Sequence, residues 1–227
     1  MTANADHFTP RMSILPAAQK TLWPQLRPAA HLGFVLYGGT AIALRLGHRQ
    51  SVDFDFFSVE PLDKARLFAA FPFASSATVL QDQANTWTLL VPVDAIAQTH
   101  VKISFFGTIA FGRYGTVQWT DDEVLRVASL DDLMATKAKV ILQRIEVKDY
   151  QDIAAMLRAG TSLERSLAIA RAMFGTNFQP SESLKAMTWF EGGDLGLLSE
   201  DDRQTLVKFA AGVRKLPCVT RVGDSLQ

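Results

Sequence analysis

The stretch YGGTAIALRLGHRQSVDFDFF, residues 37–57, combines two features that decide the fold. Gly38 and Gly39 follow a short apolar run and precede a helical pattern. The closing letters VDFDFF then place Asp53 and Asp55 on an otherwise apolar strand. Like charges repel each other at such short range. We therefore expect a cation to compensate the two aspartates, and a metal ion is the usual candidate.

The alternation of side chains along a strand puts Asp53 and Asp55 on one face. Val52, Phe54 and Phe56 then share the opposite face and have the character of a core. The Cβ atoms of the two aspartates would lie roughly 6–7 Å apart, within reach of one divalent ion or of two. Carboxylate oxygens suit Mg²⁺, which completes its shell with water and substrate phosphates. The alternative is a solvated strand that carries two exposed acids.

The glycine pair opens a short helix that Gly47 is expected to end. Glycines at this point let the backbone approach a ligand closely, and a helix N-terminus offers free N–H groups to a phosphate. Thr40 adds a hydroxyl and stands at a position suited to an N-cap. A tight turn with a threonine cap would explain the same residues. Taken with the acid pair, however, a phosphate-binding turn predicts a nucleotide site.

The remaining pattern predicts an α+β fold. The chain has 227 residues, of which 48% are hydrophobic, enough for one large domain or two small ones with a well-buried core. Alternating segments predict strands at residues 33–37, 52–58 and 99–106 and a hairpin over 77–92. Helical patterns follow at residues 130–146, 148–159, 162–174, 181–190 and 201–213. We expect a mixed α/β domain over residues 1–120 and a helical domain over 121–227.

Composition excludes several classes of protein. The 23 basic and 23 acidic residues balance, so the chain lacks the basic excess typical of proteins that hold duplex DNA through its phosphates. A single cysteine excludes an internal disulfide and a cysteine-based zinc site. No apolar run is long enough to predict a membrane span, and the first residues lack a secretory signal pattern. We therefore expect a cytoplasmic protein with no membrane partner.

Two segments closely resemble a known family. The motif GGTAIALRLGHR with SVDFDFF is similar to the opening motif of the AbiEii/AbiGii toxin family, which belongs to the DNA polymerase beta-like nucleotidyltransferase superfamily. A second signature, a helical lysine followed by a K-D-x-x-D-type segment, is matched by Lys137, Asp149 and Asp152. The resemblance covers roughly residues 30–160. It implies a small mixed β-sheet with flanking helices, followed by a helical C-terminal part.

The resemblance also implies an activity. Asp53 and Asp55 would hold Mg²⁺, an acceptor hydroxyl would attack the α-phosphate of an NTP, and pyrophosphate would leave. Lys137, Asp149 and Asp152 would belong to the nucleotide-binding site. Lys137 would contact the nucleotide phosphates, and Asp149 or Asp152 could compensate for a missing metal-binding acid. A solvated lysine and acids favoured by a helix N-terminus are the alternatives. Some family members are toxins of type IV toxin–antitoxin or abortive-infection pairs, and some modify tRNA. An NTP, a tRNA or other RNA acceptor and a cognate antitoxin are therefore the expected partners.

The sequence departs from the superfamily at one expected ligand. A third carboxylate normally stands on a later strand, and the alternation of residues 100–106 places Ser104 at that point. Serine cannot supply the missing negative charge, so a catalytically impaired nucleotide-binding module remains the alternative function. Arg45 and Arg49 have two interpretations as well: they reach phosphate or RNA, or they pair with surface acids.

Overall fold

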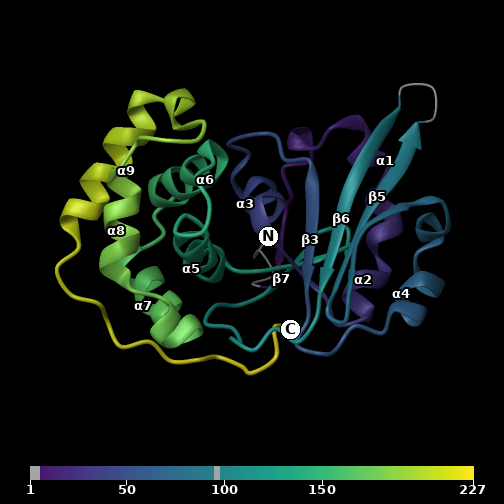
Figure 1. Cartoon of the computed structure of the whole chain (residues 1–227). Coiled ribbons are helices and arrows are strands. Elements are labelled where there is room, and N and C mark those ends of the chain that lie inside the picture. The colour runs from purple at the N-terminus through teal and green to yellow at the C-terminus, as the bar shows by residue number, and fades with distance from the viewer. Residues whose placement is uncertain (1–5, 95–97) are drawn as a thin grey trace. The chain divides into compact units, whose positions relative to one another are not determined.

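The computed structural model describes residues 6–94 and 98–227. The chain forms two compact units (Figure 1). The N-terminal unit comprises Met1–Gly112, Thr116–Ala128 and Gly223–Gln227, and the C-terminal unit comprises Arg113–Gly115 and Ser129–Val222. Among the described residues, none of the helices has the length and hydrophobicity that a membrane span requires.

A mixed sheet forms the centre of the N-terminal unit. Its described strands follow the order β1-β7-β8-β2-β3-β6-β5-β4. Their bounds are His7–Phe8 (β1), Val35–Tyr37 (β2), Asp53–Phe57 (β3), Thr78–Gln83 (β4), Thr86–Asp94 (β5), Thr99–Phe106 (β6), Gln118–Thr120 (β7) and Arg126–Val127 (β8). β3 pairs antiparallel with β2 and parallel with β6, and β6 pairs antiparallel with β5. The middle of the sheet is therefore built by the strands that the alternation predicted.

Helices flank this sheet. They are Ala17–Leu22 (α1), Pro28–His31 (α2), Gly38–Leu46 (α3) and Lys64–Ala70 (α4). α1 packs against β5 and β6, whereas α3 packs against β2 and β3 (Figure 1). Aromatic side chains fill the core: Phe54, Phe56 and Phe105 are fully buried, and the rings of Phe56 and Phe105 stack 5.3 Å apart. Burial of each such ring contributes about 1.5–3 kcal/mol, which fixes the face that β3 turns inward.

Residues 223–227 return to the N-terminal unit, which no sequence pattern predicted. Leu226 is buried there, and the side chain of Gln227 accepts a hydrogen bond of 2.8 Å from Arg126 Nη1. Gln227 Nε2 also lies so close to Gly33 that a Cβ atom on this glycine would meet it at 2.6 Å. These contacts attach the tail to β8 and to the turn that precedes β2.

The C-terminal unit is helical, as the sequence predicted. Its longer helices are Leu130–Val140 (α5), Val147–Arg158 (α6), Leu163–Phe174 (α7), Pro180–Thr188 (α8) and Glu200–Gly212 (α9). Ser129, Ser162 and Ser199 cap α5, α7 and α9 by accepting a backbone N–H with their side chains, each worth about 1 kcal/mol. The expected helix over residues 130–146 ends early, at Val140. Apolar spacing continues through Ile141 and Ile145, so periodicity could not reveal this end.

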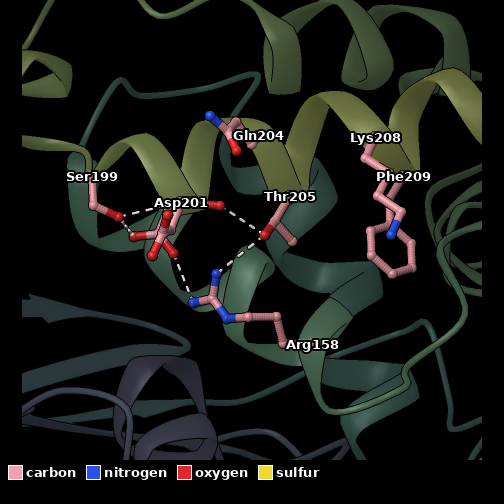
Figure 2. Close-up of a pocket in the computed structure, with 8 residues that line it drawn as sticks. Arg158, Ser199, Asp201, Gln204, Thr205, Lys208 and Phe209 are labelled. Carbon is pink, nitrogen blue, oxygen red and sulfur yellow. Dashed lines mark hydrogen bonds and ion pairs between the residues drawn. The ribbon is translucent and has the colours of Figure 1, made fainter.

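A cleft of about 580 Å³ lies on the C-terminal unit between the end of α6 and the start of α9 (Figure 2). Arg158 Nη2 lies 2.7 Å from Asp202 Oδ1, and Arg158 Nη1 donates to Thr205 Oγ1 at 3.3 Å. Ser199 Oγ donates to the other carboxylate oxygen of Asp202 at 2.8 Å. Arg158 on α6 is therefore bonded to two side chains of α9, and these bonds hold α9 against α6.

Candidate active site

The acid pair lies on one face of β3. Asp53 and Asp55 are half-buried, whereas Phe54 and Phe56 between and beside them are fully buried on the opposite face. Strand alternation alone accounts for this arrangement. The two carboxylates are thus held on a rigid central strand and remain accessible to a ligand, as a metal-binding pair requires.

The glycine pair packs directly against the acid pair. α3 begins at Gly38, whose φ is +74°, and a Cβ atom there would lie 2.5 Å from Asp55 Oδ2. At Gly39 a Cβ atom would meet Arg49 Nη2 at 2.4 Å. At Gly38 the positive φ and the close carboxylate both require glycine, whereas at Gly39 the Arg49 side chain would have to move aside. The structure therefore brings together the turn and the acids that the sequence interpretation placed in one site.

Thr40 does not cap the helix, which corrects the sequence-based expectation. Tyr37 occupies the N-cap position, and among the described residues no side chain caps α3. The Thr40 side chain is buried and instead hydrogen-bonds the Asp53 carbonyl oxygen, with Ser51 Oγ 2.7 Å away. The hydroxyl therefore attaches α3 to β3. The first N–H groups of the helix have no intrahelical partners, and such groups bind anions.

The neighbouring strand β6 adds a lysine and a serine to this face. The parallel register sets Lys102 opposite Asp53 and Ser104 opposite Asp55. Lys102 Nζ lies 2.8 Å from Asp53 Oδ2, and Ser104 Oγ lies 3.4 Å from Thr88 Oγ1 on β5. Within residues 6–94 and 98–227, no cluster of three or more His, Cys, Asp or Glu side chains could hold a metal ion. The strand pairing therefore puts Ser104 beside Asp55, at the position where a third carboxylate was expected.

The two arginines near this region have different positions. Arg45 is half-buried and donates to the carbonyl oxygens of Ala128 and Val127 at 2.9 and 3.0 Å. Burial lowers the pKa of its guanidinium to about 10. Arg45 therefore joins α3 to the strand β8, which is neither of the two roles expected for it. Arg49, by contrast, lies beside Gly39 at the start of α3.

Lys137, Asp149 and Asp152 form a buried cluster in the C-terminal unit. Lys137 Nζ lies 2.5 Å from Asp149 Oδ1 and 2.7 Å from Asp152 Oδ2, and both carboxylates are fully buried. Arg144 Nε lies 2.8 Å from Asp149 Oδ2. Burial alone would raise the pKa of Asp149, but the hydrogen bonds and charges of Arg144 and Lys137 outweigh it and hold that pKa below its usual range. The lysine is therefore engaged with α6 and is not the solvated side chain of the alternative interpretation.

Comparison with known proteins identifies the family. The model described as "Nucleotidyl transferase AbiEii toxin, Type IV TA system" matches residues 25–210, which include the glycine pair, the acid pair and the Lys137 cluster. The chain belongs to the AbiEii family. It is thus a nucleotidyltransferase of the toxin class found in type IV toxin–antitoxin systems, and the family resemblance predicted from its two motifs is confirmed.

Individual proteins also resemble this AbiEii chain. An uncharacterized protein of Aquifex aeolicus, aq_aa25, is 29% identical over 161 residues, which are 70% of this chain and 74% of the relative. The solved structure of MenT4, a nucleotidyltransferase toxin of Mycobacterium tuberculosis H37Rv, matches with a TM-score of 0.57 at 14% identity. That match covers 87% of this chain and 82% of MenT4. It confirms the α+β fold with a mixed sheet and flanking helices.

The donors of the AbiEii site fit a hard divalent cation. Asp53 and Asp55 offer carboxylate oxygens on one accessible face, and the uncapped start of α3 lies beside Asp55. Mg²⁺ in proteins commonly takes one or two carboxylates and leaves its other positions to water and phosphate oxygens. The pair therefore suits an ion that arrives with a nucleotide better than a closed, all-protein metal site.

Sequence reasoning assigned no role to Lys102 and left the role of Arg49 open between binding phosphate or RNA and pairing with surface acids. A signal for Lys102 existed, since the alternation that placed Ser104 on the site face also placed Lys102 there. Arg49 lies in the loop between α3 and β3, and no periodicity predicts the direction of a loop side chain. Both residues add positive charge next to the acids and the glycine pair.

An alanine at Gly38 is expected to weaken Mg²⁺-dependent nucleotide binding at least about tenfold, or 1.4 kcal/mol. The new Cβ would meet Asp55 Oδ2 at 2.5 Å and displace the carboxylate. Gly47→Ala is the matched control, because Gly47 has a similar φ of +69° but its Cβ would meet Arg11 at an ordinary 3.4 Å. Both variants should lose about 1–3 kcal/mol of stability from backbone strain. Equal nucleotide affinities of the two variants, measured by titration, would contradict the expected clash.

Proposed function

We propose that this AbiEii enzyme transfers a nucleoside monophosphate from an NTP to an acceptor hydroxyl with the help of Mg²⁺. Asp53 and Asp55 hold the metal ion, and the start of α3, at Gly38, Gly39 and Thr40, holds the triphosphate. The observation that carries the proposal is the distance of 2.5 Å between a Cβ at Gly38 and Asp55 Oδ2. It means that a phosphate at the helix start and an ion on the acid pair would be neighbours.

The chain's own residues then act mainly by position and charge. The N–H groups of the first turn of α3 donate to phosphate oxygens, and the helix dipole favours their negative charge. Asp53 and Asp55 orient the ion, which, when bound, neutralises charge on the phosphates. A bond forms between the acceptor oxygen and the α-phosphorus while the bond to pyrophosphate breaks. Because β3 carries both acids on a buried strand, little reorganisation is needed during transfer.

The role of the Lys137 cluster in nucleotide binding stays a prediction. The ion pairs of Lys137 with Asp149 and Asp152 favour a different task, which is to hold α5 against α6. A lysine that is paired with two buried carboxylates has no spare positive charge for a phosphate. The effect of replacing Lys137 on stability and on nucleotide affinity separates the two roles.

We propose an RNA, with tRNA as the first candidate, as the acceptor, and a cognate antitoxin as a partner. Support comes from the type IV toxin–antitoxin family to which the chain belongs. The balanced charge of the chain, 23 basic and 23 acidic residues, argues that the acceptor is held by a local surface and not by overall attraction to phosphates.

A second candidate function is a nucleotide-binding module with little or no turnover. The observation that favours it is Ser104, which is buried beside Asp55 where a third carboxylate would assist catalysis. Such a module would bind Mg²⁺ and an NTP without releasing pyrophosphate.

Incubation with each labelled NTP, Mg²⁺ and total tRNA tests the first function. We expect transfer of label with at least one nucleotide, and none with an Asp53→Ala variant. If transfer is absent but the NTP with Mg²⁺ raises the melting temperature, the binding module is supported, because a ligand stabilises the state that binds it. Absence of both transfer and stabilisation would contradict both functions.

A further inference from the structure

Lys102 is fixed next to the acid pair by the backbone. The parallel pairing of β3 and β6 sets Lys102 directly opposite Asp53, and the ammonium lies 2.8 Å from Asp53 Oδ2. Side chains opposite each other on one sheet face are close neighbours whatever their rotamers. Any ion bound by Asp53 will therefore meet a resident positive charge on the β6 side of the site.

The charge of this site matches that of a two-ion site. Two carboxylates, one ammonium and one divalent ion together carry a single positive charge. Three carboxylates with two divalent ions, the arrangement of two-metal phosphoryl-transfer sites, carry the same net charge. Ser104 in place of a third carboxylate and Lys102 on the same strand each make the site more positive by one charge. Together they supply the two positive charges that a second divalent ion would bring.

The lysine is also exposed enough to serve a ligand. Side-chain exposure is 40% for Lys102 and 29% for Asp53, so water reaches the pair. An ion pair of this exposure contributes little to stability. Lys102 can therefore turn toward a phosphate without a large loss of folding energy, unlike the buried Lys137.

We propose that Lys102 is a positioning residue that takes the place of a second metal ion, so that the site works with one divalent ion. The inference rests on the proposed function of Asp53 and Asp55. It assigns Lys102 to the side of Asp53 that faces β6, where the ammonium neutralises the acid in the free enzyme and the nucleotide phosphates in the complex. Ser104 keeps that side free of the negative charge that would recruit another ion.

Counting bound Mn²⁺ by electron paramagnetic resonance, with a non-hydrolysable NTP analogue present, tests this inference. We expect one Mn²⁺ for each wild-type chain and two for a Lys102→Met, Ser104→Asp double variant. Without nucleotide, Lys102→Met should bind Mn²⁺ about threefold more tightly, because a repelling charge is removed. The control is Lys64→Met, which removes a lysine paired with Asp82 at the exposed strand β4 and should leave Mn²⁺ affinity unchanged.

Two results would overturn the role of Lys102: two Mn²⁺ ions in the wild type, or equal Mn²⁺ affinities for Lys102→Met and Lys64→Met. An Asp53→Asn variant separates this failure from a failure of the proposed function. If Asp53→Asn binds Mn²⁺ as the wild type does, the acid pair is not the metal site and the proposed function fails. If Asp53→Asn loses Mn²⁺ but Lys102→Met changes nothing, only the inference on Lys102 fails.

Discussion

Replacement of Asp55 by asparagine is expected to lower the rate of nucleotidyl transfer about a thousandfold or more while the protein stays folded. The amide keeps the shape of the carboxylate but loses its charge, so a metal ion is held weakly next to the start of α3. Charge stabilisation by a bound ion is worth several kcal/mol, and each 1.36 kcal/mol is a factor of ten in rate. Removal of one of two repelling charges should leave the melting temperature equal or higher.

Asp82→Asn is the control for this experiment. Asp82 is an exposed acid on β4 of the same sheet and pairs with Lys64, so its loss should leave transfer unchanged. Single-turnover rates of both variants with saturating NTP and Mg²⁺ give the comparison. An Asp55→Asn enzyme that keeps more than about a tenth of the wild-type rate would show that Asp55 is not a metal ligand in the reaction.

Replacement of Lys137 by methionine is expected to destabilise the C-terminal unit by about 3–5 kcal/mol. The fully buried carboxylates of Asp149 and Asp152 would lose the ammonium that pairs with both of them, whereas Asp149 would keep its ion pair with Arg144. Lys148→Met is the control, because Lys148 lies on α6, the helix that carries Asp149 and Asp152, and its ion pair with Glu146 is exposed. Its loss should cost at most about 1 kcal/mol. Urea unfolding followed by far-UV circular dichroism measures both free energies.

The same Lys137 variant separates structure from nucleotide binding. If the ion pairs hold α5 against α6, unfolding becomes easier, and at low temperature, where the variant is still folded, nucleotide affinity stays near that of the wild type. A variant with normal stability and a nucleotide affinity lowered at least tenfold would instead show that Lys137 serves the phosphates.

Much of the site could be predicted because strand alternation is a strict geometric rule. The two-residue period placed Asp53 and Asp55 on the face opposite Phe54 and Phe56, and it placed Ser104 on the same side of β6. The glycine pair was informative because two adjacent glycines before a helix usually mark a tight turn or a close approach of the backbone to another group. These features depend on residues close in sequence, which is why they could be recognised without coordinates.

Other features depend on contacts between residues far apart in the sequence. Thr40 resembled an N-cap, but its hydroxyl bonds the Asp53 carbonyl, and only the packing of α3 on β3 reveals that partner. The strands β1, β7 and β8 span two or three residues, too few for any period to appear. The cluster of Lys137 with Asp149 requires that α5 and α6 fold against each other. The partner of Thr40, the three short strands and the Lys137 cluster are therefore visible only in the tertiary structure.

Diffraction from crystals grown with Mn²⁺ and a non-hydrolysable NTP analogue tests whether Asp53 and Asp55 hold the metal ion of a bound nucleotide. We expect an anomalous Mn²⁺ peak about 2.2 Å from carboxylate oxygens of both residues, with phosphate oxygens at the first N–H groups of α3. A nucleotide and ion bound elsewhere, with both carboxylates outside coordination distance of the Mn²⁺ peak, would contradict it.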